Sequence, residues 1–175
     1  MRGDLQVVGY QTAVPRRIGA STTRFYTGEP LHSVATSSSG AASTNVYVPA
    51  AADTPVIGTH RFGGIVNAKD PLPQPTGTLV AQTTLAACPI PNIGRIRGKA
   101  ETAASIDTEA ELLGVIGDYT LIDYAATGGV GSTPLYTIKE VASADTSGLE
   151  IAEGNIAKGT LDVYVAYAAY RHDIS

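Results

Sequence analysis

The stretch from Thr160 to Arg171 reads TLDVYVAYAAYR, and it constrains the fold more than any other part of the chain. Its apolar side chains alternate, and β-branched and aromatic residues, which pack well on a pleated sheet, predominate. The pattern predicts a β-strand. One face would carry Leu161, Val163, Val165, Tyr167 and Ala169, and the other Asp162, Tyr164, Ala166, Ala168 and Tyr170. Because the second face has a single charged residue, we expect another layer of the chain or a neighbouring subunit to cover it. The alternative is that this face, with its small side chains, is exposed to solvent.

The composition favours many short strands around one core. The 175 residues include 19 glycines and 10 prolines, and only 16% are charged. No long helical period is visible, so the sequence predicts an all-β fold, a β-sandwich or partly closed β-barrel with one short helix and an extended N-terminal arm. Short strands are predicted at residues 31–35, 45–49, 61–66, 77–83, 93–99, 117–124, 134–141 and 149–151, in addition to the last one.

Local signals refine three of these elements. The helix is expected to begin at Asp107 and to end at Gly114, because an N-cap candidate and acidic residues precede a glycine. The glycines at 63 and 64 predict a bulge or a close backbone approach inside a strand. The basic residues of 93–99 are expected to protect a sheet edge; they are Arg95, Arg97 and Lys99.

The charges divide the chain into two parts. Residues 1–27 carry four arginines and one aspartate (4 − 1 = +3), and residues 28–175 carry 8 basic and 15 acidic residues (8 − 15 = −7). We therefore expect an extended basic arm at 1–27 and a single β-rich domain at 28–175, with the arm docking on an acidic neighbour. Nucleic acid is not an expected partner, because the arginines are few and no aromatics interleave with them. The expected contact residues of the arm are Arg2, Arg16, Arg17 and Arg24.

The sequence offers no convincing catalytic or metal centre. Cys88 is the only cysteine and lies in an apolar segment, where a small buried side chain is expected. The histidines (32, 60 and 172) lack metal-ligand spacing, and no nucleophile elbow or phosphate-binding loop is present. We therefore expect no catalytic residue, no metal, no cofactor and no enzymatic activity. No apolar run is long enough to cross a bilayer, so a membrane partner is not expected either.

A group of carboxylates leaves one alternative open. Six acidic residues and no basic residue lie between 101 and 123. They could form a divalent-cation site or an acid–base pair, but a helix N-terminus and a solvated acidic face is the preferred interpretation. The six are Glu101, Asp107, Glu109, Glu111, Asp118 and Asp123.

Four segments of the chain form a recognisable set: Gly28-Glu29-Pro30, the run PVIGTHRFGGI at 55–65, the ending NIAKGT at 155–160 and the helical TEAELLG at 108–114. Together they resemble the head decoration, or cement, proteins of tailed bacteriophages. The resemblance covers about residues 25–172. The chain departs from that family in its Ser/Ala-rich loop at 36–44 and its Pro-rich connector at 70–76.

The resemblance implies a virion protein on the capsid exterior that stabilises the head, with the major capsid protein and further copies of itself, in a homotrimer, as partners. The arm arginines would then contact the capsid or an adjacent trimer, and no catalytic residue would be carried over. The expected subunit interface is Tyr164, Tyr167 and Tyr170. Two alternatives remain: another phage structural component (tail-tube, head-completion or major capsid protein), or a module that binds a host surface or glycan.

Overall fold

The fold of the protein is built from short strands. The computed structural model describes residues 5–18, 27–34, 46–49, 60–67, 82–124, 136–140 and 147–170. The strands are β1 (Gln6–Val8), β2 (Gln11–Ile18), β3 (Pro30–Val34), β4 (Val46–Pro49), β5 (His60–Val66), β6 (Gln82–Pro89), β7 (Arg95–Lys99), β8 (Ile122–Tyr124), β9 (Tyr136–Ile138), β10 (Leu149–Asn155) and β11 (Thr160–Val165). The helical segments are α1 (Glu109–Val115) and the 3-10 helices η1 (Ala103–Ile106), η2 (Ile156–Lys158) and η3 (Tyr167–Tyr170). The predicted all-β class is confirmed.

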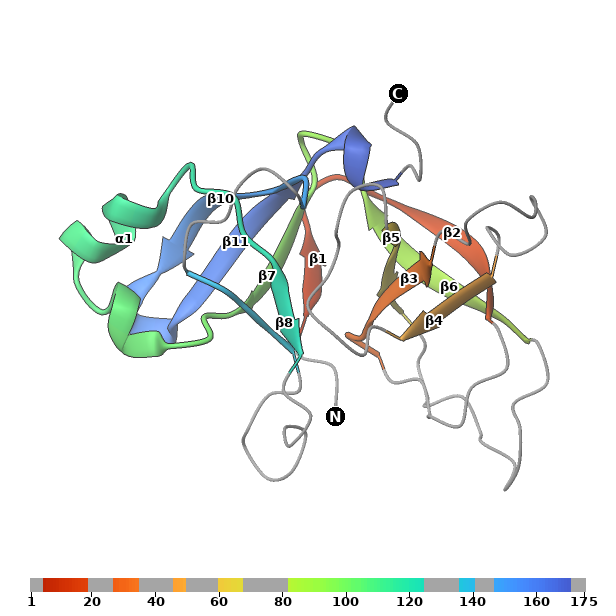
Figure 1. Cartoon of the computed structure of the whole chain (residues 1–175), viewed down its shortest axis with the longest axis horizontal. Coiled ribbons are helices and arrows are strands. Elements are labelled where there is room, and N and C mark those ends of the chain that lie inside the picture. Colours follow the sequence, from red (N-terminus) through yellow and green to blue (C-terminus); the bar gives the residue numbers. More distant parts are fainter. Residues whose placement is uncertain are drawn as a thin grey trace, which may run out of the picture.

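The strands form two bodies that lie side by side (Figure 1). The first is an antiparallel sheet in the order β1-β7-β11-β10, with α1 at its far end. The second is a ring in the order β2-β4-β3-β5-β6, in which β6 pairs again with β2 and closes a small barrel. The pairing of β2 with β4, at Arg17 and Ile18, is parallel, whereas the pairing of β2 with β6 is antiparallel. A separate antiparallel pair, β8-β9, joins the first body through a bridge between Ala100 and Ile138.

The N-terminal stretch is extended, but over residues 5–18 it is not a separate arm. Strand β1 pairs with β7 of the open sheet, and β2 pairs along its whole length with β6 of the barrel. The predicted boundary between residues 27 and 28 therefore does not divide an appendage from a body. Local sequence could not show this, because the partners of β2 in β6 lie more than sixty residues further along the chain.

The last strand has the predicted inner face but a different end. Leu161, Val163 and Val165 are fully buried in the larger core, together with Ile96 of β7 and Ile151 of β10. The alternation continues to Ala169 in the sequence, yet the chain leaves the sheet after Val165 and turns into η3.

The second face of β11 is covered by the chain itself at Asp162, whereas Tyr164 and Ala166 on that face are only partly buried. Asp162 is 2% exposed, and its carboxylate accepts two hydrogen bonds from Arg97, of 2.6 and 2.7 Å. Arg97 lies on β7, which pairs with both β1 and β11 and is an inner strand. The prediction that Arg95, Arg97 and Lys99 protect a sheet edge is therefore wrong, because these side chains lie across a sheet face.

The helix and the predicted bulge are present, with one correction. The N-cap of α1 is Thr108 and not Asp107: the Thr108 side chain accepts from the Glu111 N–H, and the Glu111 carboxylate accepts from the Thr108 N–H. This reciprocal pair is a capping box. The pairing of β3 with β5 shifts register between Leu31 and His32, next to Gly64, whose φ is +102°.

Two other predicted boundaries differ from the structure. Of the strand expected at 77–83, residues 82 and 83 belong to β6, which continues to Pro89. Residues 77–81 lie outside the described part of the chain. The strand expected at 117–124 is shortened to β8, because residues 117–120 instead bond to the outer edge of β10 through Leu149 and Ile151.

Candidate functional site

The turn between β6 and β7 brings the two bodies together. The Ile90 N–H donates to the Tyr10 carbonyl at 3.0 Å, and the Asn92 N–H donates to the Val165 carbonyl at 2.9 Å. Gly94 allows this approach, since a Cβ there would lie 2.1 Å from the Tyr10 oxygen. The turn is thus fixed by the link between β1 and β2 on one side and by the end of β11 on the other.

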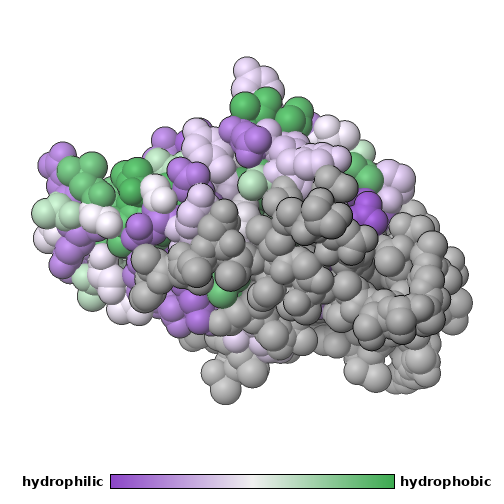
Figure 2. Space-filling model, turned by 45° about the horizontal axis from the view of Figure 1, so that its top comes forward, coloured by the Kyte–Doolittle hydropathy of each residue, from purple (hydrophilic) through white to green (hydrophobic). Residues whose placement is uncertain are grey.

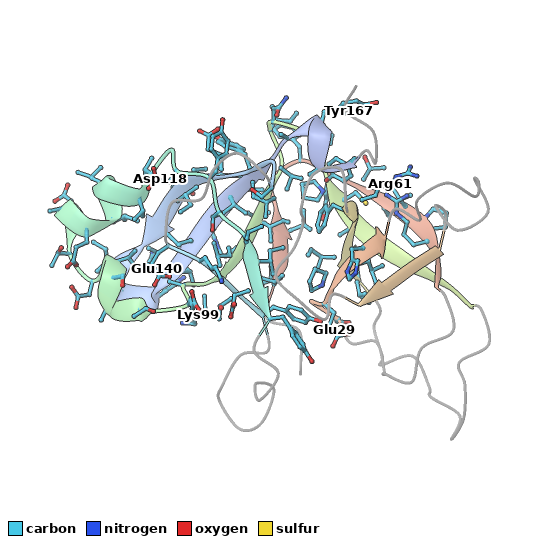
Figure 3. All side chains as sticks on the ribbon, in the orientation of Figure 1. Glu29, Arg61, Lys99, Asp118, Glu140 and Tyr167 are labelled. Carbon is cyan, nitrogen blue, oxygen red and sulfur yellow. The ribbon has the colours of Figure 1, made fainter. Side chains whose placement is uncertain are left out.

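Large apolar side chains are exposed on and beside this turn. Tyr10 is 67% exposed, Ile93 52% and Tyr167 60%, and Ile90 is also exposed. We call Tyr10, Ile90, Pro91, Ile93 and Tyr167 the apical patch. Figure 3 places Tyr167 above the junction of the two bodies, and green, hydrophobic atoms gather along the upper edge of the molecule in Figure 2. Exposed apolar groups gathered in this way are typical of association surfaces.

A hollow of about 320 Å³ opens within this patch. Ile90, Pro91 and Tyr167 form part of its wall, and Arg16 and Cys88 also line it. The arrangement offers an apolar depression beside projecting aromatic rings. It can therefore receive an apolar side chain of a partner while Tyr167 packs on the partner's surface.

The polar groups in the hollow serve the fold. The Arg16 guanidinium donates from Nε to the Gly63 carbonyl at 2.8 Å, and its Nη2 lies 3.5 Å from Cys88 Sγ. Burial raises the pKa of the Cys88 thiol, and the neighbouring Arg16 charge only partly opposes this. The thiol is therefore protonated at neutral pH, as expected for a structural cysteine and not for a nucleophile.

The three predicted interface tyrosines have different surroundings. Tyr167 lies in the apical patch. Tyr170 is part of the fold, because its hydroxyl donates to the Pro89 carbonyl at 2.7 Å and its ring packs against Phe62 with centroids 5.6 Å apart. Tyr164 lies on the open sheet, where the Arg95 guanidinium sits 5.9 Å from its ring centroid. The structure therefore brings Tyr167 and Tyr170 to the same hollow, whereas Tyr164 lies apart from it.

The predicted arm arginines are also separated. Arg16 is half-buried: its guanidinium is fixed by Gly63 and lies beside Cys88, and it also lines the hollow, so its contact with a neighbour stays a prediction. Arg17 lies in β2, and its side chain is outside the described part of the structure, as are residues Arg2 and Arg24.

The acidic residues between 101 and 123 do not converge. Glu111 completes the helix cap, and Asp123 lies 3.5 Å from the Lys139 ammonium. Among the described residues no group of three or more His, Cys, Asp or Glu side chains is placed to hold a metal ion. His32 is buried in the barrel, His60 begins β5, and His172 is outside the described ranges. No helix in the described part is long and apolar enough to span a membrane.

Comparison with protein-family models, with curated proteins and with solved structures finds no significant match to this chain.

Sequence reasoning found Tyr167 but missed the rest of the apical patch. Tyr10, Ile90 and Ile93 look like ordinary core residues in the sequence, and only the pairing of β1 with β7 brings them to one end of the molecule. The signal that could have found them is the Pro89-Ile90-Pro91 run, because two prolines around an isoleucine disfavour a continuing inner strand.

Proposed function

We propose that the protein is a structural component of a tailed-phage virion that decorates and stabilises the outer surface of the capsid. Its partners would be the major capsid protein and further copies of itself, assembled as a homotrimer. The resemblance of residues 28–30, 55–65 and 155–160 to decoration proteins supports this class of function. The apical patch is the observation that carries the mechanism, since it gives the protein a surface suited to association.

Burial of the patch would supply the driving force. Aromatic side chains remove about 150–250 Å² from water when fully buried, at about 25 cal/mol per Å². Tyr10 and Tyr167 are each more than half exposed, so both retain most of this gain for a partner. An aromatic residue at the centre of an interface typically accounts for about 2 kcal/mol or more of binding.

The weaker contacts of the proposal are the basic residues near the N-terminus. Arg2, Arg17 and Arg24 would meet an acidic neighbour, and Arg16, although bonded to Gly63, lines the hollow that faces the partner. Several copies held in one assembly would bind a capsid more tightly than one copy, because linked weak contacts act together.

The test begins with the mass of the purified protein in solution, followed by co-sedimentation with expanded empty capsids. Tyr167→Ser should abolish assembly or capsid binding. Leu113→Ser is the matched control, because Leu113 is similarly exposed (63%) but lies on α1 at the far end of the open sheet. A variant at Tyr167 that assembles and binds like the native protein would refute the proposed surface.

A further inference from the structure

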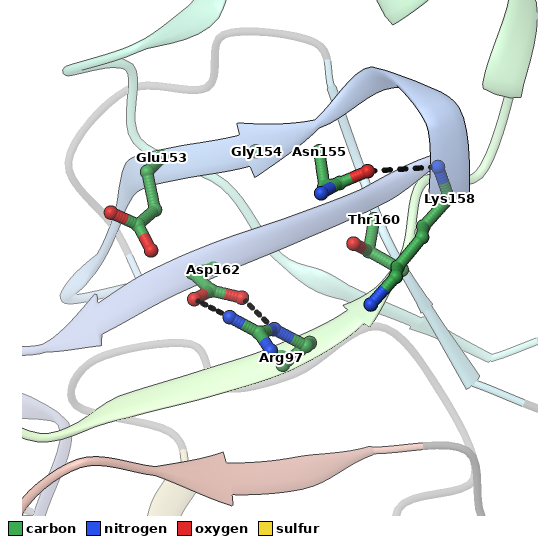
Figure 4. A pocket seen from close by; sticks show the side chains of 7 residues that line it. All are labelled: Arg97, Glu153, Gly154, Asn155, Lys158, Thr160 and Asp162. Carbon is green, nitrogen blue, oxygen red and sulfur yellow. Dashed lines mark hydrogen bonds and ion pairs between the residues drawn. The ribbon is translucent and has the colours of Figure 1, made fainter.

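The open sheet carries a small polar pocket on the face that looks away from the core. It lies beside the hairpin formed by β10, η2 and β11, and it has a volume of about 100 Å³ (Figure 4). Four of its lining residues bear hydrogen-bond donors: Arg97, Asn155, Lys158 and Thr160. The carboxylates of Glu153 and Asp162 also line it, and each is paired with an arginine of β7. This pocket is separate from the apical patch and shares no residue with it.

Arg97 is held with one edge of its guanidinium turned to the protein. Its Nε and Nη2 donate to the two oxygens of Asp162, which is nearly inaccessible to water. A guanidinium has five N–H donors in one plane, so the bidentate pair leaves the Nη1 end for a ligand. Asp162 is thus a positioning residue that presents Arg97 to the pocket.

The hairpin places the other donors. The Asn155 side-chain oxygen accepts from the Lys158 N–H at 3.0 Å and caps η2, and Gly159 closes the turn with a φ of +57°. Because Asn155 uses its oxygen for this cap, its NH₂ group remains as a donor. Lys99 fixes the turn from β7, since its ammonium donates to the Lys158 carbonyl.

The local charge is opposite in sign to that of the whole chain. Arg95 pairs with Glu153 at 2.8 Å and Arg97 pairs with Asp162, so these four charges cancel. The charged residues that line the pocket sum to zero (2 − 2), because Arg97 and Lys158 are balanced by Glu153 and Asp162. With Arg95 and Lys99, which flank the pocket on β7, the group carries +2 (4 − 2), whereas the chain carries −4. An anion would be attracted to this point and would meet several oriented donors.

We propose that this pocket binds a single oxyanion, such as a phosphate, a sulfate or a carboxylate group. Its volume accommodates one such group, and sites for larger ligands measure about 300–1,000 Å³. Arg97 and Lys158 supply the charge, and Thr160 and Asn155 supply neutral donors. This inference does not depend on the proposed function, because a free anion and an acidic side chain of another protein present the same chemistry.

The experiment is an NMR titration of the full-length protein with sodium phosphate, sulfate and acetate, each compared with sodium chloride at equal ionic strength. We expect phosphate to shift the backbone amides of residues 155–160, with a dissociation constant on the order of 1 mM, as for a few charge-assisted hydrogen bonds. Binding by acetate tighter than that by phosphate would assign the pocket to carboxylates. Binding restricted to phosphate and sulfate would assign it to tetrahedral anions.

Variants decide whether the named residues form the site. Lys158→Gln and Thr160→Val should each weaken phosphate binding at least about fivefold, the loss expected for one hydrogen bond to a charged group. Lys139→Gln is the matched control, because it removes the same charge at a lysine that lies beside Asp123, outside the pocket. An unchanged amide fingerprint away from the substitution establishes that each variant is folded. Shifts with phosphate no larger than those with chloride, or native affinity in Lys158→Gln, would overturn the proposal.

Discussion

Three glycine-to-alanine substitutions separate backbone strain from steric conflict, and they test how closely β5 and β6 approach each other. At Gly64 the φ of +102° disfavours any side chain, and a Cβ would lie 2.6 Å from Cys88 Sγ and 2.9 Å from the Ala87 carbonyl oxygen. At Gly117 the φ is +89° but no atom lies within 4 Å of the Cβ position. At Gly114, inside α1, neither restriction applies.

The expected magnitudes follow from these differences. Gly114→Ala should stabilise the protein by about 0.5–1 kcal/mol, because alanine loses less backbone entropy in a helix. Gly117→Ala should cost about 1–2 kcal/mol of unfolding free energy from backbone strain alone. Gly64→Ala adds overpacking of about 1–3 kcal/mol to a similar strain, for a total of about 2–5 kcal/mol.

Urea unfolding followed by circular dichroism measures all three. With a slope of about 2 kcal/mol per molar urea, Gly64→Ala should lower the midpoint by about 1–2.5 M and Gly114→Ala should raise it slightly. If Gly64→Ala lost no more stability than Gly117→Ala, the close approach of β5 to Cys88 would not exist as described.

Three further substitutions or titrations test the packing. Burial raises the pKa of Tyr136 and Tyr170 above the usual value, so both hydroxyls stay protonated in the folded protein when they ionise in the unfolded chain. Above about pH 10 the free energy of unfolding should therefore fall by about 1.4 kcal/mol per pH unit for each tyrosine. Tyr170→Phe should reduce that slope in alkaline unfolding curves, and an unchanged slope would contradict the burial. Thr108→Ala should cost about 1 kcal/mol in thermal unfolding by removing the cap of α1, whereas equal stability would show that the capping box contributes nothing. Cys88 should react with a thiol reagent at neutral pH far more slowly in the native protein than in urea, and equal rates would mean that the thiol is accessible.

Local pattern predicted the elements that depend on local chemistry. Alternation along residues 161–165 placed those side chains in the core, and the glycine pair at 63 and 64 indicated the irregularity in β5. The short helix was also expected, although Thr108 and Asp107 are both suitable caps and only the Glu111 side chain decides between them. The end of β11 could not be predicted, because η3 is fixed by distant partners such as the bond from Arg61 to the Tyr170 carbonyl.

What the sequence could not predict depends on pairing over long distances. Strand β2 contains Pro15 and two arginines and shows no clean alternation, so it looked like an arm. Its pairing with β6 converts it into one side of the barrel and turns Arg16 toward the Gly63 carbonyl. The same limit applies to the sites: the apical patch depends on three separate segments, and the oxyanion pocket depends on the register that places Arg97 opposite Asp162.

The most direct test of the account is co-sedimentation of the native protein and of Tyr167→Ser with expanded empty capsids of tailed phages. The account predicts that the native protein pellets at a fixed ratio to the capsid protein and that the Tyr167→Ser variant stays in the supernatant while remaining folded. Native protein that fails to pellet with capsids at any concentration would contradict the decoration role.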